Sequence, residues 1–523
     1  MDGVRPSAGP IRKGGGVRIP LDRSSSLPLY QQIAGFLREQ IRAGSLAPET
    51  RLPATRELAR LLGTSRVTVA NAYADLESEG LLISRMGSGT YVALLPGGLE
   101  RNSSERAEGD WPLWQQRLLT STWLPAMREL DSLLSAVPRR NPISFASGMG
   151  ATDLFPVADF RKALTAVLRE EDSETLGYGD RAGNPALCAT IAHILGAQGI
   201  PARQEEVLIT SGSQQALALV GRLLLRPGDR VLVESPTYSG AIDLFRSLDV
   251  NLQGIPMDEE GMRMDRLEDG MRSGQAKLLY TIPTFHNPTG LCLSANRRRQ
   301  VLALAQRYNV PVLEDDFAGD LRYDGRALPA LKALDPGGWV IYTGTFSKML
   351  MPGLRVGFLV ASGPIYNGLL ALKRTTDIAT SNLMQRALQA YITVGRYQTH
   401  LRRACRVYRA RRDCLIEALE AYMPAGTRWQ TPQGGLFVWV RLPGDLSATA
   451  LYPLAADEGV VFAPGSLFFP AERDQPYLRM NFTVYPADTI QEGVRRLAAA
   501  VAKAQKVSEG DRQRHRQEHP ATL

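Results

Sequence analysis

The chain has 523 residues, of which 44% are hydrophobic and 22% charged, and its 61 lysines and arginines exceed its 53 aspartates and glutamates to give a formal net charge of +8. This length exceeds that of one ordinary domain, and this composition excludes a largely disordered chain. The basic excess favours a polyanionic partner. No apolar segment is long enough to span a bilayer or to act as a secretion signal, so a cytoplasmic protein without membrane contact is expected. The four cysteines show no Cys-x-x-Cys spacing, and no metal site is expected.

Shifts in composition divide the chain into five segments. The first is rich in glycine, proline and arginine and is expected to be disordered, and the third is a polar stretch typical of a linker. The second is compact and largely helical, whereas strands and helices alternate in the fourth. In chain order we predict a disordered arm (1–22), a small helical domain (23–93), a linker (94–141), a large α/β domain (142–505) and a polar tail (506–523).

The small domain begins with a helix whose apolar residues recur at helical spacing over residues 30–41. Two shorter helices follow, with Gly63 between them. Thr55 is placed to cap the first of these and Ser65 the second. Two short helices joined by a glycine-containing turn are typical of a helix-turn-helix motif. The stretch LLISRMGSGTYVA then predicts a two-stranded hairpin, the wing.

The outward side chains of this domain indicate what it binds. A recognition helix presents its N-terminal residues to base edges in the major groove, and arginine suits guanine or phosphate. An arginine on the wing can reach a minor groove or a phosphate. The alternative is a helical packing module with surface arginines. The candidate DNA-binding residues are Arg56, Ser65, Arg66, Thr68, Asn71 and Arg85.

The whole stretch from LYQQIAGFLREQ through TSRVTVANAYADLESEG to GTYVA resembles the winged-helix domain of GntR-family regulators. The resemblance implies a winged helix-turn-helix that binds a double-stranded DNA operator. One departure is Ala70, because some members have arginine at this position, and the operator sequence therefore cannot be copied from those members. The family's DNA-contacting positions fall on Arg56, Ser65, Arg66, Thr68 and Gly87.

The large domain contains short apolar strands with helical patterns between most of them, which predicts an α/β domain with a mainly parallel sheet. Open sheets of this class bind ligands at the carboxyl ends of their strands, so the residues that follow each strand are the candidates for a site. The predicted strands include Val207–Thr210, Val231–Glu234, Leu278–Ile282, Val310–Glu314, Val340–Thr343 and Val356–Val360.

Two of these strand ends carry groups suited to a phosphate and to a pyridine ring. In VLITSGSQQAL, the residues Gly212, Ser213 and Gln214 open a helix whose free N–H groups favour a phosphate, although an ordinary capped helix explains the same pattern. In EDDF, Asp315 ends a strand, where a carboxylate can keep a pyridine nitrogen protonated. Asp316 is the competing candidate for this role.

A third strand end, in GTFSKMLMPGLRVGF, carries a lysine. Lys348 follows a strand and a small polar turn, where a lysine can form a Schiff base with an aldehyde. Arg355, seven positions on, suits a bidentate grip on phosphate. Thr345 and Ser347 offer hydroxyls to the same group.

Four further motifs each contribute one side chain. Asn287 in FHNPTG can donate a hydrogen bond to a phenolic oxygen, and Tyr238 in ESPTYSG can stack on an aromatic ring. Tyr178 lies in the glycine-rich stretch LGYGDRAGNPAL. Arg479 in YLRMNF can clamp a substrate carboxylate.

Together and in this order, these segments resemble the fold-type I aminotransferases of class I and II over about residues 143–504. The resemblance implies an α/β/α domain of the PLP-dependent transferase fold type I with a smaller α+β subdomain. It also implies pyridoxal 5'-phosphate as the cofactor and a homodimer. Lys348 would then be the catalytic residue that forms the internal aldimine.

The same resemblance implies a role for each of the other motif residues. Asp315 would pair with the pyridine nitrogen, Asn287 would contact the ring phenol and Tyr238 would stack on the ring. Tyr178 would reach the cofactor of a neighbouring subunit, and Arg479 would bind the α-carboxylate of an amino acid. The phosphate would be held by Gly212, Ser213, Gln214, Thr345, Ser347 and Arg355.

Two departures from relatives concern the ligand. Phe317 stands where many relatives have tyrosine, and the missing hydroxyl removes one hydrogen bond to the ring phenol. Cofactor binding should survive this change, whereas catalysis should slow. Gly240 stands where the branch that senses γ-aminobutyrate is expected to have arginine, which weakens γ-aminobutyrate as the effector.

A winged helix, a linker and an aminotransferase-like domain in one chain is the architecture of the MocR/GabR regulators. This resemblance implies a PLP-dependent transcriptional regulator that senses the cofactor or an amino-acid-like effector, because a ligand that binds two states unequally shifts their balance. The alternative is a working amino-acid aminotransferase that carries a DNA-binding module, since every core catalytic residue type is present.

Overall fold

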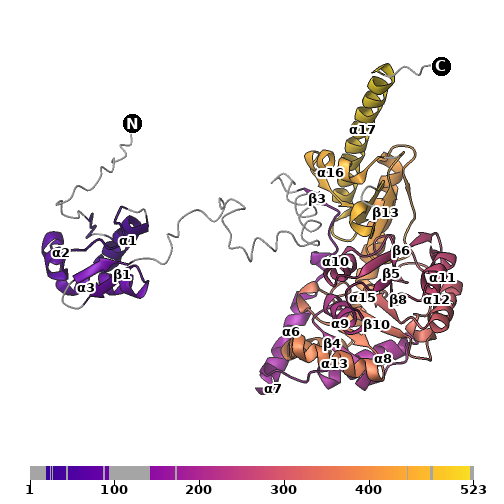
Figure 1. Cartoon of the computed structure of the whole chain (residues 1–523), viewed down its shortest axis with the longest axis horizontal. Coiled ribbons are helices and arrows are strands. Elements are labelled where there is room, and N and C mark those ends of the chain that lie inside the picture. The colour runs from indigo at the N-terminus through magenta and orange to yellow at the C-terminus, as the bar shows by residue number, and fades with distance from the viewer. Residues whose placement is uncertain are drawn as a thin grey trace. The chain divides into compact units, whose positions relative to one another are not determined.

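The computed structural model describes residues 19–93 and 142–518, apart from residues 24, 26, 43–44, 86–88, 171–172, 445 and 472–474. The chain forms two compact units that divide between residues 121 and 122 (Figure 1). Each unit has a hydrophobic core of its own. The expected arm up to residue 18, the expected linker at 94–141 and Gly87 of the expected wing lie outside the described residues.

The first unit packs three helices and a hairpin around one core. The helices are α1 (Leu29–Arg42), α2 (Thr55–Leu62) and α3 (Arg66–Ser78), and β1 (Leu82–Arg85) pairs antiparallel with β2 (Gly89–Val92). Ile33, Val69 and Leu76 are fully buried in the core. Ile19, which was expected in the disordered arm, is buried in the same core, so the ordered chain begins before residue 23. This is the winged helix-turn-helix that the sequence predicts.

The local sequence explains where these helices begin and end. Gly63 ends α2 in the left-handed conformation, with a φ of 60° that glycine adopts at little cost. The Ser65 hydroxyl caps α3 by accepting the Thr68 N–H at 3.1 Å. The prediction that Thr55 caps α2 is wrong by one residue. The backbone is still extended at Ala54, with a ψ of 146°, and Thr55 is already helical.

The second unit is built on an eight-stranded sheet. In spatial order its strands are β4 (Val207–Thr210), β11 (Gly357–Val360), β10 (Val340–Thr345), β9 (Val312–Asp316), β8 (Ala276–Thr281), β5 (Arg230–Ser235), β6 (Asn251–Asp258) and β7 (Gly261–Met262). β9 pairs parallel with β10 and β8, and β5 pairs parallel with β8 and β6. β11 runs antiparallel to β10 and β4, and β7 runs antiparallel to β6. The sheet is therefore mainly parallel, as the sequence predicts.

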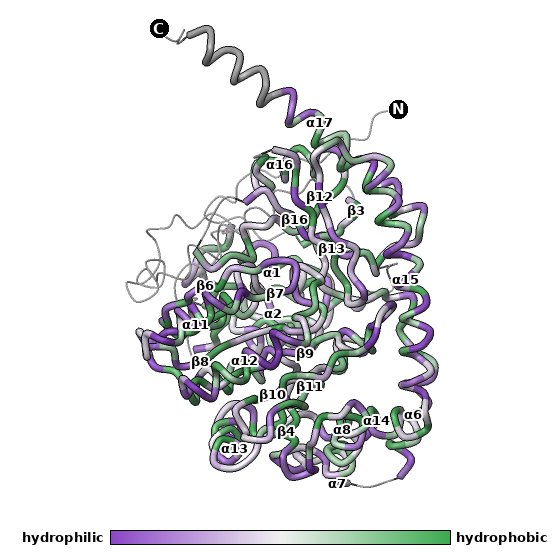
Figure 2. The backbone as a smooth tube through the Cα atoms, turned by 90° about the vertical axis from the view of Figure 1, so that its right-hand side faces the viewer, coloured by the Kyte–Doolittle hydropathy of each residue, from purple (hydrophilic) through white to green (hydrophobic). Residues whose placement is uncertain are grey.

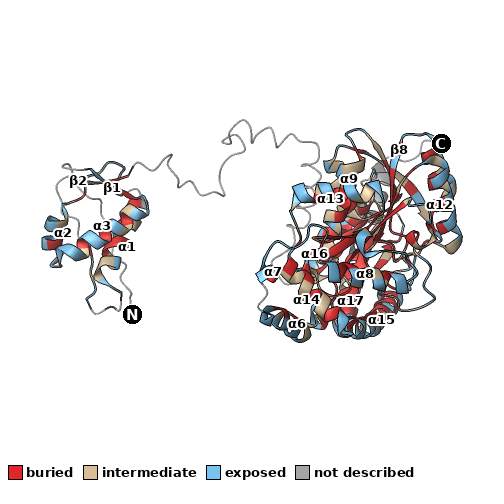
Figure 3. Ribbon diagram, turned by 90° about the horizontal axis from the view of Figure 1, so that it is seen from below, coloured by how far each residue is buried: buried red, intermediate tan, exposed pale blue. Residues whose placement is uncertain are grey.

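Helices flank this sheet, with buried strands in the middle and the exposed faces of the helices outside (Figure 3). Short 3-10 turns lie at 152–154, 204–206, 332–334, 352–354 and 465–468. The helices of the sheet-bearing part are α6 (Val157–Arg169), α7 (Ser173–Leu176), α8 (Pro185–Ala197), α9 (Ser213–Leu224), α10 (Ser239–Ser247), α11 (Met264–Arg272), α12 (Ala295–Tyr308), α13 (Pro364–Thr376) and α14 (Asn382–Thr393).

A smaller α+β part completes the second unit. Its four-stranded antiparallel sheet has the order β12 (Arg428–Trp429), β13 (Phe437–Arg441), β16 (Tyr477–Asn481) and β15 (Ala463–Pro464), and β3 (Ile143–Ser144) pairs parallel with β14 (Val460–Val461). The helices here are α15 (Arg396–Tyr422), α16 (Ala448–Asp457) and α17 (Ala487–Glu518). Hydrophobic and hydrophilic residues alternate along α15 (Figure 2). Twelve residues of this helix are buried. α17 continues past residue 505, where the predicted large domain ends.

Several parallel strands of the large sheet end at the same edge, and this positions the candidate site. β9 ends with Asp315 and Asp316, and Lys348 follows the end of β10. Tyr238 follows β5 and Asn287 follows β8. These residues, which come from distant segments, therefore end or follow strands whose carboxyl ends lie at one edge of the sheet. Among the described helices, none is long and apolar enough to cross a membrane.

Two separate cores predict two separate unfolding transitions. Leu76→Ala removes a fully buried side chain from the core of the first unit and should destabilise that unit by about 2–5 kcal/mol. Leu61→Ala is the matched control, because Leu61 is 53% exposed on α2 and its truncation should cost less than about 0.5 kcal/mol. Scanning calorimetry of the full chain should show Leu76→Ala lowering one transition alone. A single transition, or equal shifts in both, would contradict two independent cores.

Candidate functional site

The amine of Lys348 lies within a cluster of charged side chains. Burial, together with the nearby positive charges of Arg479 and Arg355, lowers the pKa of Lys348 to about 8 despite the opposing charge of Asp315. A Cβ on Gly148 would lie 3.8 Å from Lys348 Nζ, so the glycine leaves space beside the amine. A lysine in this setting has a substantial neutral fraction near pH 8, which is the form that attacks a carbonyl.

Asp315 is buried and has one free oxygen. The Tyr280 hydroxyl donates to Asp315 Oδ2 at 2.9 Å, whereas Oδ1 has no hydrogen-bond partner in the described part of the chain. Burial raises the pKa of Asp315 to about 7, although the hydrogen bond from Tyr280 opposes this shift. A cationic ring nitrogen placed at Oδ1 would satisfy that oxygen and favour the charged carboxylate.

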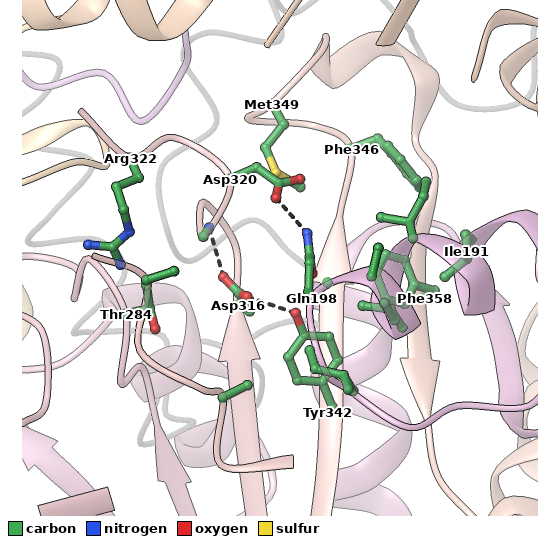
Figure 4. Close-up of a pocket in the computed structure, with 18 of the residues that line it drawn as sticks. Ile191, Gln198, Thr284, Asp316, Asp320, Arg322, Tyr342, Phe346, Met349 and Phe358 are labelled. Carbon is green, nitrogen blue, oxygen red and sulfur yellow. Dashed lines mark hydrogen bonds between the residues drawn. The ribbon is translucent and has the colours of Figure 1, made fainter. Parts of the chain in front are cut away.

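Asp316, the competing candidate, points to the other face of the strand, because successive residues in a strand alternate. It accepts hydrogen bonds from the Tyr342 hydroxyl at 2.7 Å and from the Gly319 N–H at 2.8 Å. It lines a separate cavity of about 370 Å³, where Gln198 donates to Asp320 at 2.6 Å (Figure 4). Since Asp316 is already bonded on both oxygens, the geometry favours Asp315 as the partner of a ring nitrogen.

The expected phosphate ligands meet at the start of α9. Gly212 precedes this helix with a φ of 99°, and a Cβ on it would lie 2.7 Å from a guanidinium nitrogen of Arg355. The Ser347 N–H donates to Thr345 Oγ1 at 3.2 Å, and the buried Ser347 hydroxyl has no partner in the described residues. Free helix N–H groups, a hydroxyl and a guanidinium together suit a phosphate dianion. Ser213 and Gln214 occupy the first turn of the helix.

A buried ion pair that the sequence analysis missed holds this turn in place. Lys373 Nζ, which is fully buried, donates to both carboxylate oxygens of Asp377 at 2.9 Å. The Ser211 hydroxyl donates to Asp377 at 3.2 Å, and the Ser211 carbonyl accepts from Arg355 at 2.8 Å. The backbone before Gly212 is therefore fixed from two sides. No motif signals this pair, because Lys373 and Asp377 lie on and beside an ordinary amphipathic helix.

Asn287 and Arg479 are joined directly. Arg479 Nη1 donates to Asn287 Oδ1 at 2.9 Å, and Nη2 donates to the Ala146 carbonyl at 2.7 Å. The guanidinium carbon lies 4.1 Å from the ring centroid of Phe437 and 4.9 Å from that of Phe468. Burial lowers the pKa of Arg479 to about 9. A carboxylate ligand would restore the charge balance of this buried cation.

The ring of Tyr238 packs close to Gly240. A Cβ on Gly240 would lie 2.5 Å from the Tyr238 ring, so a larger residue cannot occupy this position without moving the ring. The Tyr238 hydroxyl donates to Gln214 Oε1 at 3.4 Å, and Gln214 Nε2 donates to the Gly240 carbonyl at 2.9 Å. The absence of arginine at Gly240 thus has a steric basis in this chain.

Two other predicted features lie at different places in the unit. Phe317, which replaces a tyrosine of many relatives, is buried and stacks on Phe437 with centroids 6.2 Å apart. Its ring therefore contributes to the packing beneath Arg479. Tyr178 is 77% exposed, so it does not share the burial of the Lys348 cluster.

The glycine-rich segment FASGMG, which the sequence analysis did not select, lies against the cluster. Asn481 Nδ2 donates to the carbonyls of Ser147 and Met149 at 2.8 and 2.7 Å. The Tyr408 hydroxyl accepts the Ala151 N–H at 2.9 Å. Two glycines within three residues after a short strand were the available signal, because close backbone approach requires residues without side chains.

These residues fit the pyridoxal phosphate that the sequence predicts. Five buried side-chain atoms lack hydrogen-bond partners in the described residues, and three of them belong to the Lys348 cluster: Asp315 Oδ1, Ser347 Oγ and Arg479 Nε. The other two are Thr237 Oγ1 and His286 Nε2. Buried polar atoms are normally satisfied, so three such atoms in the Lys348 cluster fit a polar ligand that would bond to them. They match a pyridine nitrogen, a phosphate and a carboxylate respectively, and Lys348 matches the aldehyde.

The candidate DNA-binding residues lie around the N-terminal end of α3. Arg56, Arg66 and Asn71 are exposed, whereas Thr68 is half-buried. Ser65 is exposed but its hydroxyl already caps the helix. Arg85 donates to Glu49 at 3.2 Å and lies 5.0 Å from the ring centroid of Tyr91, so part of its charge is engaged within the domain.

Family models match both units. Residues 141–497 match the aminotransferase class I and II model, and residues 29–92 match the model of bacterial regulatory proteins of the gntR family. Two full-length relatives are regulators by name. The probable rhizopine catabolism regulatory protein MocR of Rhizobium meliloti is 32% identical over 92% of this chain and 95% of its own. The HTH-type transcriptional regulator TauR of Rhodobacter capsulatus is 33% identical over 90% and 96%.

Solved structures match the second unit. The multiple substrate aminotransferase of Thermococcus profundus is 37% identical, with a TM-score of 0.70 over 75% of this chain and 99% of its own. The α-aminoadipate aminotransferase LysN of Thermus thermophilus, complexed with N-(5'-phosphopyridoxyl)-L-leucine, is 35% identical, with a TM-score of 0.69 over 75% and 99%. Each match therefore includes nearly the whole length of the aminotransferase.

The lowered pKa of Lys348 predicts how cofactor capture depends on pH. Only the neutral amine attacks the aldehyde, so the rate of capture should rise with pH and level off above about pH 8 rather than near the ordinary lysine value of 10.5. The neutral fraction at pH 7 is then larger by about two orders of magnitude than for an ordinary lysine. Stopped-flow visible absorption after mixing the apoprotein with pyridoxal phosphate measures this rate. A midpoint near 10.5 would contradict the buried, cation-flanked amine.

Proposed function

This chain belongs to the MocR-type regulators, in which a GntR-family domain precedes an aminotransferase class I and II domain, and we propose that it regulates transcription in response to an amino-acid-like ligand bound at its pyridoxal-phosphate site. One observation carries the proposal. The chain holds both the Lys348 cluster and, in a separate unit, a helix α3 with Arg66 and Asn71 exposed near its start. An aminotransferase requires only the first of these features.

Each residue of the cluster has a task toward the cofactor and ligand. When bound, pyridoxal phosphate supplies an aldehyde carbon and an electron-accepting ring. Lys348 offers the neutral amine, and Asp315 holds the proton at the ring nitrogen. Arg355 binds the phosphate in the turn before α9, and Arg479 binds the carboxylate of the ligand. A ligand with both an amino group and a carboxylate satisfies this site best.

The ligand acts on DNA binding through linkage. With pyridoxal phosphate bound, the Lys348 amine would hold the aldehyde carbon, and an amino compound that took its place there would leave the lysine side chain free. This exchange would change the charge next to Arg479 and Asp315. DNA affinity changes only if the ligand binds the two arrangements of the protein unequally. Free energies of coupling between sites are usually about 1–3 kcal/mol, which corresponds to a change in affinity of roughly 5- to 150-fold.

A second copy of the chain is part of the proposal. Leu176, Tyr178 and Ile378 are large apolar side chains that are 73%, 77% and 50% exposed. The segments that carry them are neighbours, because Asn382 Nδ2, at the start of α14, donates to the Glu174 carbonyl of α7 at 2.8 Å. A homodimer that covers this surface would bury these side chains and bring Tyr178 toward the cofactor of the other copy.

Retained transamination is the second candidate function. Three residues needed for this reaction lie at one edge of the large sheet, namely Lys348, Asp315 and Asn287. The fourth, Arg479, donates a hydrogen bond to Asn287. The aminotransferases named above are similar to the second unit over nearly their full length. Both functions use the same cluster, so turnover must be measured separately from DNA binding.

Arg66 should contribute to operator binding. Arg66→Ala should weaken binding to DNA upstream of the chain's own gene by roughly 5- to 150-fold, the range for loss of one specific arginine contact. The control is Arg161→Ala, which removes the same charge from an exposed position on α6 of the other unit and should change affinity less than twofold. Mobility shifts at two salt concentrations measure both. Equal affinity of Arg66→Ala and wild type would exclude α3 as the recognition helix.

Lys348→Ala separates regulation from catalysis. The variant should keep basal operator binding and lose the response to amino compounds, because the first unit has its own core. A screen of amino acids against operator binding by wild type and variant measures this. Keto acid formed by wild type beyond one equivalent per chain indicates a working aminotransferase. A ligand response that persists in Lys348→Ala would place the sensing site elsewhere.

A further inference from the structure

Tyr280 lies beneath the carboxylate that faces the cofactor site. It is fully buried in β8, next to β9, which carries Asp315, and its hydroxyl donates to Asp315 Oδ2 at 2.9 Å. Its ring packs edge-on against Phe245 of α10, with centroids 5.8 Å apart. Side-chain packing and the strand backbone therefore both fix the direction of this hydroxyl.

We propose that Tyr280 is a positioning residue for the cofactor ring, because its hydroxyl occupies Oδ2 of Asp315 and leaves Oδ1 to bind the ring nitrogen. An aspartate carboxyl rotates easily about its last bond, and two equivalent oxygens otherwise offer two orientations. A single donor on Oδ2 removes this ambiguity. The role rests on the proposed binding of pyridoxal phosphate at Lys348.

The hydroxyl also keeps the carboxylate charged. Burial favours the protonated form of Asp315, and so does the negative charge of Asp316 and Glu234 nearby. Lys348 and the Tyr280 hydrogen bond oppose them. Tyr280 remains a donor, since burial and Asp315 raise the pKa of Tyr280 well above its usual value. Without this donor, the proton shared between ring nitrogen and carboxylate shifts toward the carboxylate.

The neighbouring carboxylate supplies a matched control. Tyr342 is also buried, and its hydroxyl donates to Asp316 Oδ2 at 2.7 Å on the other face of β9 (Figure 4). Tyr280→Phe and Tyr342→Phe each delete one hydroxyl from a buried tyrosine–aspartate hydrogen bond. Only the first of these bonds involves the carboxylate that faces the cofactor.

The test compares the full-length holoproteins by equilibrium dialysis of pyridoxal phosphate and by pH titration of the visible band of the bound cofactor. Tyr280→Phe should weaken cofactor binding about tenfold or more, as expected for loss of a hydrogen bond to a charged group. Its visible band should titrate at higher pH than in wild type, because a less positive ring withdraws less charge from the nitrogen of Lys348. Tyr342→Phe should change neither quantity.

Asp315→Asn provides a second background in which the charge is absent. There, Tyr280→Phe should no longer shift the titration, whereas damage to packing would persist. An unchanged titration in Tyr280→Phe, or an equal shift in Tyr342→Phe, would overturn the positioning role. Wild type that binds no cofactor and shows no visible band would instead overturn the proposed function. The two failures are therefore distinguishable.

Discussion

The candidate site of the second unit depends on one constraint: the amine of Lys348 is buried near two guanidinium groups and one carboxylate. Burial and the two guanidinium groups lower the pKa of Lys348 to about 8. Burial also lowers the pKa of Arg479 and raises the pKa of Asp315. Each of these groups is costly to bury alone. The parallel strands β9 and β10 end at the same edge of the sheet, which brings the carboxylate of Asp315 and the amine of Lys348 near each other. Opposite charges at this edge offset part of the cost of burial. The unpaired atoms of Asp315, Ser347 and Arg479 suit a ring nitrogen, a phosphate and a carboxylate.

The supporting residues show how this cluster is kept rigid. Lys373 and Asp377 fix the turn before α9, Tyr280 orients Asp315, and Asn481 holds the FASGMG segment. The side chain of Met349, next to Lys348 in the sequence, accepts a hydrogen bond from Tyr397 of α15 at 3.5 Å. α15, a helix of the smaller α+β part, therefore contacts the turn that carries Lys348.

The sequence was most informative at the ends of strands and least informative inside them. The winged helix, the mainly parallel sheet and the family were predicted correctly, because apolar periodicity and motif order are local signals. Asp315 and Lys348 followed from the rule that parallel sheets bind ligands at their carboxyl ends, whereas Arg479, inside β16, followed from its motif. Their roles toward the cofactor remain predictions. Tyr280 and Lys373 gave no signal, since a buried tyrosine in a strand and a lysine on a helix look ordinary until the fold brings Asp315 and Ser211 to them. Thr55 was misplaced by one residue, because a cap depends on where the backbone turns helical.

Borohydride reduction of the full-length protein with pyridoxal phosphate, followed by peptide mass spectrometry, tests the central claim most directly. The neutral, buried amine predicts that the cofactor becomes fixed to one peptide, at Lys348, with one equivalent per chain. The visible band should disappear as this happens. A protein that stays colourless with the cofactor, or that carries it on several exposed lysines and none at residue 348, would contradict the site and the regulation proposed to act through it.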